Sequence, residues 1–488
     1  MKKISLLFLS AILFWSCEKD ADDEIGIASL DTEIKDFVWK GMNTYYLWQG
    51  EVPNLADNRF ASTLQQTLVS SNASYRSFLE SYAGPAELFA ALQTKQDRFS
   101  YITDDYEILE NNLQGISLGT GMDFGLTRYD PNNQNLVLGY VRYVLPDTDA
   151  ERKGIRRGDI FMSVDGSPIT TSNYRSLLFN DNTSMNLGVF RIQNGALTPV
   201  GDFLLLKQQI NENPIYINKT FAIGNHKIGY LMYNGFVNSY DVRLNEVFAQ
   251  FKSEGITDLI LDLRYNSGGH ISSSVYLASM ITGQFNGKLF AKERWNSKLQ
   301  SVAEEFNRVD NFFTNTIHYG NDNASTQAIN SLALTRVYIL TSGSTASASE
   351  LVINGLAPYI DVNQIGATTT GKNQGSITVY DYIDNNGTKN PKHKWAMQPL
   401  VLQIENAVGF GEYTTGLTPD ITIEEDLSAM GVLGETSEPL LARAIAAITG
   451  NGKYMPKPAA MPAKPFASTK TFQIGVNDMV SDKKIKLP

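Results

Sequence analysis

A turn rich in serine and alanine stands between an apolar run at 337–340 and a helical pattern that extends to residue 357. This order of strand, turn and helix places a hydroxyl at a helix N-terminus, beside backbone N–H groups that can hold an oxyanion. Glu350 falls in the first helical turn, where the helix dipole favours an acid. The stretch therefore offers a serine nucleophile for acyl transfer, although an ordinary capped loop has the same pattern.

A serine hydroxyl needs a base, and the commonest one is scarce in this chain. The four histidines, at 226, 270, 318 and 393, stand far apart, and there is one cysteine. An amine can take the role when burial keeps it neutral. Lys372 lies in a Gly- and Thr-rich loop after an apolar run at 359–365, and no carboxylate neighbours it in the sequence to hold it charged. Lys372 is the candidate base, and an ordinary surface lysine is the alternative.

The composition narrows the functional classes. The 488 residues carry 41 Lys and Arg against 51 Asp and Glu, a net charge of −10, which leaves no broad basic surface for phosphate backbones. Nucleic-acid binding is therefore not expected. The single cysteine excludes an intrachain disulfide, a Cys-rich zinc module and a Cys-ligated iron–sulfur cluster, and the scattered histidines argue against a multi-His metal site. We expect neither a metal nor an organic cofactor.

The motif Thr-Ala-Ser-Ala-Ser-Glu at 345–350, followed downstream by Thr-x-Gly-Lys, resembles the C-terminal processing, or tail-specific, peptidases. These are serine proteases with a Ser/Lys dyad. The resemblance implies that Ser347 is the nucleophile and that Lys372, 25 positions later, is the base. The family often has Gln four residues after the Lys, whereas this chain has Ser376 there and Gln374 two after it. Either residue could orient the Lys, and the sequence leaves this open.

A second motif, Leu-Asp-Leu-Arg-Tyr-Asn-Ser-Gly-Gly at 261–269, resembles the family element that supplies part of the oxyanion hole. A strand that ends in Asn and paired Gly can turn sharply and leave an N–H free near a substrate carbonyl. The resemblance implies Gly268 or Gly269 as one donor and the N–H of Ala348 as the other. A plain turn between a strand and a helix is the alternative.

The stretch at 150–166 resembles the PDZ consensus, with Gly154 and Gly158 around a short helix and a hairpin signal at Asp165-Gly166. PDZ domains bind a chain end as an added strand, with loop N–H groups on its carboxylate. The candidate ligand loop contains Gly121, Met122, Asp123 and Phe124. Asp123 would be unfavourable beside a carboxylate, so the ligand mode stays open, and a β-domain with a packing role alone is the alternative.

The expected fold class is α/β multidomain, with a crotonase-like α/β catalytic core of the ClpP/crotonase type, an inserted PDZ-like β-rich domain and a small helical N-terminal domain. In the core, strands are expected at 228–232, 259–263, 337–340 and 400–404, with helices at 241–251, 272–281 and 347–357. The expected boundaries are 1–17 for a signal peptide, 18–29 for a tether, 30–110 helical, 115–207 PDZ-like, 213–450 peptidase core and 451–488 for a Pro-containing tail. This tail, with four Pro at 456–465, is expected to be extended or mobile.

The first 17 residues resemble a bacterial lipoprotein signal: two Lys, about a dozen apolar residues, then Ser16 and Cys17. We expect lipidation of Cys17 and an exported, membrane-anchored lipoprotein of the bacterial outer membrane, on its periplasmic side or at the cell surface. An incidental Cys within an ordinary signal peptide is the alternative.

These expectations combine into an exported serine endopeptidase that acts on protein or peptide substrates through an acyl-enzyme, while the PDZ-like domain recruits substrate segments. The rival is a catalytically inactive, peptide-binding lipoprotein with the same fold. The sequence indicates neither the natural substrate nor the oligomeric state.

Overall fold

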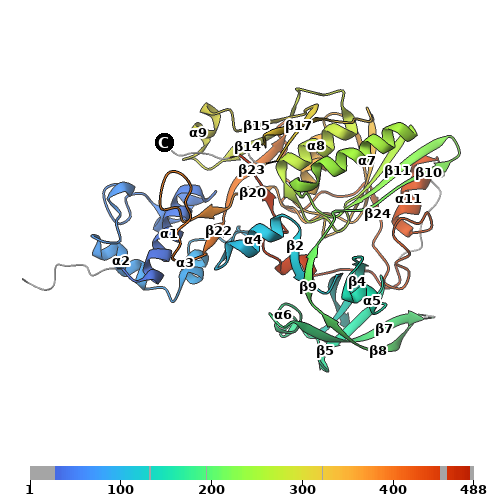
Figure 1. The fold of residues 1–488 in the computed structure, drawn as a ribbon, viewed down its shortest axis with the longest axis horizontal. Helices are drawn as coiled ribbons and strands as arrows, with labels where there is room; N and C mark the ends of the chain where they lie inside the picture. Colours follow the sequence, from blue (N-terminus) through green and yellow to red (C-terminus); the bar gives the residue numbers. More distant parts are fainter. Residues whose placement is uncertain (1–27, 131–132, 194, 321–322, 451–458, 484–488) are drawn as a thin grey trace, which may run out of the picture.

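The computed structural model describes residues 28–130, 133–193, 195–320, 323–450 and 459–483 (Figure 1). The helical region comes first, drawn in blue, and its helices begin where the sequence supplies caps. Ser29 Oγ accepts the Thr32 N–H at the start of the first helix, and Pro85 opens the third. The helices are α1 (Leu30–Tyr45), α2 (Ala73–Glu80) and α3 (Pro85–Ala91). Their buried cluster also takes in Val379 and Met397, so this region packs directly on the peptide chain that follows the Lys372 loop.

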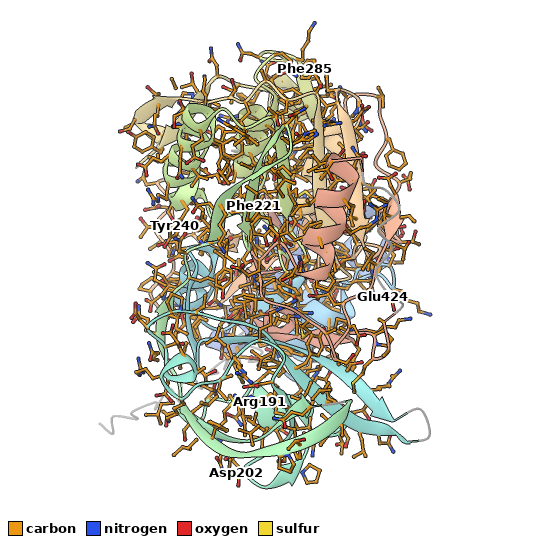
Figure 2. All side chains as sticks on the ribbon, turned by 90° about the vertical axis from the view of Figure 1, so that its right-hand side faces the viewer. Arg191, Asp202, Phe221, Tyr240, Phe285 and Glu424 are labelled. Atoms are coloured by element: carbon orange, nitrogen blue, oxygen red, sulfur yellow. The ribbon has the colours of Figure 1, made fainter. Side chains whose placement is uncertain are left out.

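The middle region is a mainly antiparallel sheet of order β25-β3-β4-β5-β7-β8. The hairpin expected at Asp165-Gly166 joins β5 to the short β6, and both turn residues have positive φ. Figure 2 places Arg191 and Asp202 of this sheet at the opposite end of the molecule from Phe285. The elements are β3 (Met122–Asp130), β4 (Asn133–Val144), α5 (Asp149–Arg152), β5 (Ile160–Val164), β6 (Ser167–Pro168), α6 (Tyr174–Leu178), β7 (Ser184–Gln193) and β8 (Ala196–Leu206). A two-stranded ribbon of β2 (Ile116–Gly119) and β9 (Gln208–Asn211) leads into and out of it.

A six-stranded sheet of order β10-β11-β12-β18-β19-β24 forms the centre of the remaining chain, and its strands from β11 onward run parallel. Alternate residues of each strand join different clusters: Leu261 packs with α7, α8 and α10, and Ile260 packs with α11. Burial on both faces explains the continuous apolar runs. The strands are β10 (Ile215–Ile223), β11 (His226–Tyr233), β12 (Asp258–Asp262), β18 (Arg336–Thr341), β19 (Asp361–Gly366) and β24 (Ile421–Thr422). The helices are α7 (Asp241–Glu254), α8 (Ile271–Thr282), α10 (Ala348–Leu356) and α11 (Pro439–Ile448).

A second six-stranded sheet has the order β13-β26-β20-β23-β14-β15, and it includes the strand expected at 400–404. That strand therefore lies outside the parallel sheet, antiparallel to β14 and β20. The strands are β13 (Gly269–His270), β14 (Leu289–Trp295), β15 (Asp310–Phe312), β20 (Gln374–Ser376), β23 (Leu400–Asn406) and β26 (Met479–Val480). Smaller elements are β1 (Tyr101–Thr103), α4 (Tyr106–Leu113), α9 (Gln300–Glu305), β16 (Thr316–Tyr319), β17 (Ser325–Ala328), β21 (Val379–Tyr380) and β22 (Ala396–Gln398).

The tail expected to be extended or mobile, 451–488, is described only at 459–483, and this part is packed against the rest of the chain. Residues 451–458 and 484–488 lie outside the described residues. Residues 459–483 carry β25 (Ala467–Ser468), the 3₁₀ turn η6 (Thr469–Phe472) and β26, and Met479 is fully buried. This part, red in Figure 1, connects the sheet of the middle region with the second six-stranded sheet. Strands of two residues have no period to detect, so the sequence pattern missed them.

Candidate active site

Ser347 lies in the turn between β18 and α10, immediately before the first helical residue. Its φ of 63° and ψ of −118° are rare for a residue with a side chain, and backbone strain of this kind collects at functional sites. The turn is fastened to the end of β12, because Thr345 Oγ1 donates to Leu263 O at 2.9 Å and the Ala346 N–H donates to Asn266 O at 3.1 Å. The Ser347 hydroxyl is fully buried and has no hydrogen-bond partner among the described residues.

Two glycines follow β12, and the first of them, Gly268, faces this hydroxyl. Gly268 and Gly269 have φ of 125° and 134°, which residues with a Cβ rarely adopt. A Cβ on Gly268 would lie 2.8 Å from Ser347 Oγ, and one on Gly269 would lie 2.1 Å from Phe236 O. Glycine is therefore required at both positions by the approach of the neighbouring chain.

The three candidate oxyanion donors differ in what they contact. The Gly268 N–H donates to Asn266 Oδ1 at 2.9 Å, whereas the Gly269 N–H donates to the carbonyl oxygen of Asp478 at 2.6 Å. Ala348 is the first residue of α10, where an amide has no acceptor within its own helix. Gly269 and Ala348 are thus the candidates with N–H groups available to a carbonyl from another segment.

Lys372 is buried in the loop between β19 and β20, with 1% of its surface exposed. Its Nζ donates to Asn477 O at 2.6 Å and to Asp478 Oδ1 at 3.0 Å, and it lies 4.8 Å from the ring centre of Phe99. The expectation that no carboxylate holds this lysine charged is therefore wrong, because the carboxylate of Asp478 pairs with it. The two residues are 106 positions apart, so no pattern in the sequence indicated this pair. In this arrangement Lys372 is ion-paired to the C-terminal segment, and the Ser347 hydroxyl has no partner.

Glu350 joins the nucleophile and the base through their backbones. Its Oε2 accepts the N–H groups of Ser347 and Lys372, both at 2.8 Å, while Oε1 accepts the Gly371 N–H at 2.7 Å and the Thr369 hydroxyl at 2.5 Å. Burial raises the pKa of Glu350, and these four donors oppose the rise. The sequence placed Glu350 at the helix start and missed this link. Its position three residues after the serine, as in a capping box, was the available signal.

The two candidates for orienting the lysine lie on β20. Ser376 Oγ accepts from Gln398 Nε2 at 3.1 Å and donates to Met479 O at 3.4 Å. Gln374 is buried. Among the hydrogen bonds of the described residues, none joins either side chain to Lys372 Nζ, whose side-chain partner is Asp478.

The Arg of the 261–269 motif, Arg264, contacts carboxylates that hold the fold together. Arg264 is fully buried and binds Asp262, Glu438 at 2.6 Å and Glu425 at 3.2 Å, which ties the end of β12 to the start of α11. Burial alone would raise the pKa of Glu425, but Arg157 and Arg264 hold it at about 2. The turn that carries the glycines is thus anchored by buried ion pairs.

The residues predicted as a ligand loop are mostly strand: Gly121 precedes β3, and Met122, Asp123 and Phe124 are its first three residues, paired with β4. Gly121 has φ 96°, and the Thr148 side chain occupies the space that a Cβ would need. Met122 and Phe124 are buried. Asp123 lies 3.6 Å from Arg142 Nη1, and burial raises its pKa to about 6 although Arg142 opposes this. The loop lines an open pocket of about 670 Å³, and Arg142 Nη2 also reaches Ser344 Oγ, three residues before Ser347, at 2.8 Å.

Cys17, the candidate lipidation site, lies outside the described residues. Within the described ranges, none of the helices combines the length and apolar character needed to cross a bilayer. In the same ranges, no group of three or more His, Cys, Asp or Glu side chains is arranged to hold a metal ion.

Comparison with known proteins gives consistent results. The model for peptidase family S41 matches residues 227–423, and the model for the peptidase S41 N-terminal domain matches residues 33–101. The chain is 22% identical over 351 residues to the chloroplastic C-terminal processing peptidase of Tetradesmus obliquus, covering 68% of this chain and 67% of that one. It is 23% identical over 316 residues to a CtpA-like serine protease of Staphylococcus aureus strain COL, covering 64% of this chain and about half (54%) of that relative.

A solved structure supports the same grouping at the level of the fold. The crystal structure of a Bacteroides fragilis protein assigned to the S41 proteases aligns with a TM-score of 0.64 and 24% identity, over 85% of this chain and 97% of that one. The shared architecture is a mixed α/β multidomain fold with a small helical N-terminal domain. The chain therefore belongs to peptidase family S41, the serine-type peptidases that include the C-terminal processing peptidases.

Proposed function

We propose that this chain is an exported endopeptidase of the C-terminal processing type, in which Ser347 is the nucleophile and Lys372 the base. The observation that carries the proposal is the buried, unpartnered Ser347 hydroxyl, held at positive φ beside the Gly268-Gly269 turn. A hydroxyl so placed is free to attack a carbonyl whose oxygen lies against the Gly269 N–H.

In the mechanism, neutral Lys372 accepts the proton of Ser347 Oγ while Oγ bonds to the carbonyl carbon of the substrate. The oxyanion of the tetrahedral intermediate accepts the N–H groups of Gly269 and Ala348. The C–N bond then breaks, the leaving amine takes the proton from Lys372, and a water molecule hydrolyses the acyl-enzyme by the same steps. Glu350 keeps the two backbones in register throughout.

The remaining parts of the proposal concern the framework. The parallel sheet would be a crotonase-like core, and residues 115–207 would be a PDZ-like domain that recruits extended substrate segments. Lipidation of Cys17 would hold the enzyme at the bacterial outer membrane. Protein or peptide substrates follow from the family.

The test compares Ser347→Ala and Lys372→Met with the parent chain, using an unfolded, reduced protein as substrate and mass spectrometry to detect fragments. We expect each variant to lose at least about a thousandfold in kcat. Ser349→Ala is the matched control: it removes a hydroxyl two residues away, which donates to Asn266 O, and should change kcat only a few-fold, by about the effect of one hydrogen bond. Cleavage that persists in Lys372→Met would exclude the dyad.

The competing function is a catalytically inactive peptide-binding protein, which the Ser376 at the family's usual Gln position favours. Peptide binding by the parent chain without any Ser347-dependent cleavage would support it.

A further inference from the structure

The C-terminal segment 466–482, here called the tail segment, first adds a strand to the sheet of the middle region. Ala467 pairs with Leu126 and Ser468 with Gly125 of β3, and the Phe124 N–H donates to Thr469 Oγ1 at 2.8 Å. β25 is the terminal strand of this sheet, so β3 would have an unpaired edge without it. The tail segment therefore occupies a sheet edge that is otherwise free to bind another chain.

Aromatic contacts complete this first binding surface. Phe466 meets Tyr174 at 5.4 Å between ring centres, and Phe472 meets Phe179 at 4.6 Å. Tyr174 begins α6, and Phe179 follows it directly. The tail segment thus lies between the edge of β3 and α6, and the addition of an extended segment to a sheet edge is a common mode of peptide recognition.

The same segment then enters the second six-stranded sheet. β26 lies between β13 and β20, where Met479 pairs with Gly269 and Val480 pairs with Ser376. β13 continues the glycine turn, and β20 follows Lys372. The tail segment therefore separates the strand that carries an oxyanion donor from the strand that follows the candidate base.

Asp478 stands at the reacting centre. Its carbonyl oxygen accepts the Gly269 N–H at 2.6 Å and lies, like Ser347 Oγ, within 2.8 Å of the position that a Cβ on Gly268 would take. Its carboxylate accepts Lys372 Nζ at 3.0 Å and the Tyr101 hydroxyl at 2.7 Å. One residue of the tail segment thus contacts both the oxyanion donor and the base.

We propose that the tail segment marks the path of a peptide substrate and blocks that path in the resting chain. This inference rests on the proposed peptidase function. A substrate binds as an extended strand at the edge of β3 and then between β13 and β20, with the carbonyl of its scissile bond against the Gly269 N–H. The tail segment itself resists cleavage because Asp478 holds the Lys372 ammonium, which then cannot accept the Ser347 proton.

The test measures binding in a background without catalysis. The probe is a fluorescein-labelled synthetic peptide with the sequence of residues 466–482, added to the full chain carrying Ser347→Ala. Two further variants loosen the tail segment: Met479→Asp places a charge at a fully buried position, and Asp478→Asn removes the ion pair with Lys372. Gln473→Glu is the control, because it adds the same charge to the tail segment at a half-buried side chain.

If the tail segment blocks the path, the labelled peptide should bind both loosened variants at least about tenfold more tightly than the Ser347→Ala chain. The reason is that a larger fraction of the loosened molecules has the tail segment displaced and can bind the peptide. Gln473→Glu should bind like Ser347→Ala alone. Near-ultraviolet circular dichroism checks the fold, and if Met479→Asp does not fold, Asp478→Asn decides. Equal affinity in the folded loosened variants and in Ser347→Ala would overturn the proposal and leave the tail segment a purely structural element.

A parallel activity assay separates this inference from the proposed function. With Ser347 restored, the loosened variants should cleave an unfolded protein about tenfold faster than the parent chain. Selective peptide binding without cleavage in any variant would reject the peptidase and retain the binding path. Cleavage by the parent chain together with equal peptide affinity would reject only the blocking tail segment.

Discussion

The nucleophile and the base are anchored in different ways. The Ser347 turn is tied to the end of β12 and to Asn266, all within the central parallel sheet and its connections. The Lys372 backbone shares this anchor through Glu350, but its ammonium group is held by Asn477 and Asp478 of the tail segment. The half of the site that contains Ser347 and the glycine turn is thus anchored in the core, although the Gly269 N–H also contacts the tail segment, and the ammonium group of the base is held by the segment that we propose to be displaced.

The largest effect should come from the fixed half. Gly269→Ala places a Cβ 2.1 Å from Phe236 O at a φ of 134°, so the turn must shift and its N–H must move. We expect kcat to fall about a hundredfold or more, as for loss of an oxyanion donor. Steady-state kinetics with a peptide substrate measure this.

Gly255→Ala is the control for backbone strain alone, because Gly255 has φ 68° at the end of α7 with open space around its Cβ position. It should lower stability by about 1 kcal/mol without changing kcat. Equal losses of kcat in both variants would show that the glycine turn has no special role in catalysis.

A smaller effect is expected where the two halves meet. Glu350→Gln replaces one acceptor oxygen by an NH₂ group facing backbone N–H donors, so one side of the link breaks. We expect kcat to fall about tenfold to a hundredfold with a smaller change in KM. Glu405→Gln, a partly exposed residue of β23 paired with Arg294, serves as the matched control. An unchanged kcat would mean that the two backbones do not need this connection.

The smallest expected effect is a pH dependence of the contact between His270 and the tail segment. His270 Nδ1 lies 2.6 Å from Asp482 of the tail segment; burial lowers the pKa of His270, but Asp482 and Asp241 outweigh it and raise the pKa above 6.5. The charged pair is therefore fully present below about pH 6.5 and is lost as the pH rises through the folded-state pKa. Asp241, whose pKa burial raises to about 7, ionises over a similar range and partly counteracts this loss.

Loosening of the tail segment should thus increase with pH. In the Ser347→Ala chain we expect a labelled peptide of residues 466–481, which lacks Asp482 and so cannot form this pair itself, to bind a few-fold more tightly at about pH 8.5 than at about pH 6. His270→Gln should flatten this dependence. The same pH profile in both chains would show that His270 does not control how firmly the tail segment is held.

The parts of the molecule that could be predicted from the sequence are those encoded within one short stretch. The strands of the parallel sheet are buried on both faces, so β12 and β18 appear as apolar runs, and α10 starts where the small residues end. The Ser347 turn and the glycine turn follow from those boundaries. The PDZ-like assignment and the lipid anchor stay predictions.

The features that the sequence did not predict depend on contacts between distant residues. Asp478 pairs with Lys372 across 106 positions, and its own neighbourhood carries no helical or strand period. The role of Glu350 was hidden for a related reason, since two of its donors, Gly371 and Lys372, come from a loop more than 20 positions away. A pattern within one short stretch of sequence cannot predict a contact between residues so far apart.

The position of β26 in its sheet has a consequence for synthesis. A ribosome makes the chain from its N-terminus, so Met479 and Val480 emerge after every other strand of the sheet that they complete. Met479 pairs with Gly269, a loop closure of 210 residues, and closures of this length are slow. A newly made chain would therefore pass through an interval in which β13 and β20 stand apart without their central strand. During that interval the polypeptide nearest to the unpaired edges of β13 and β20 is the nascent chain itself.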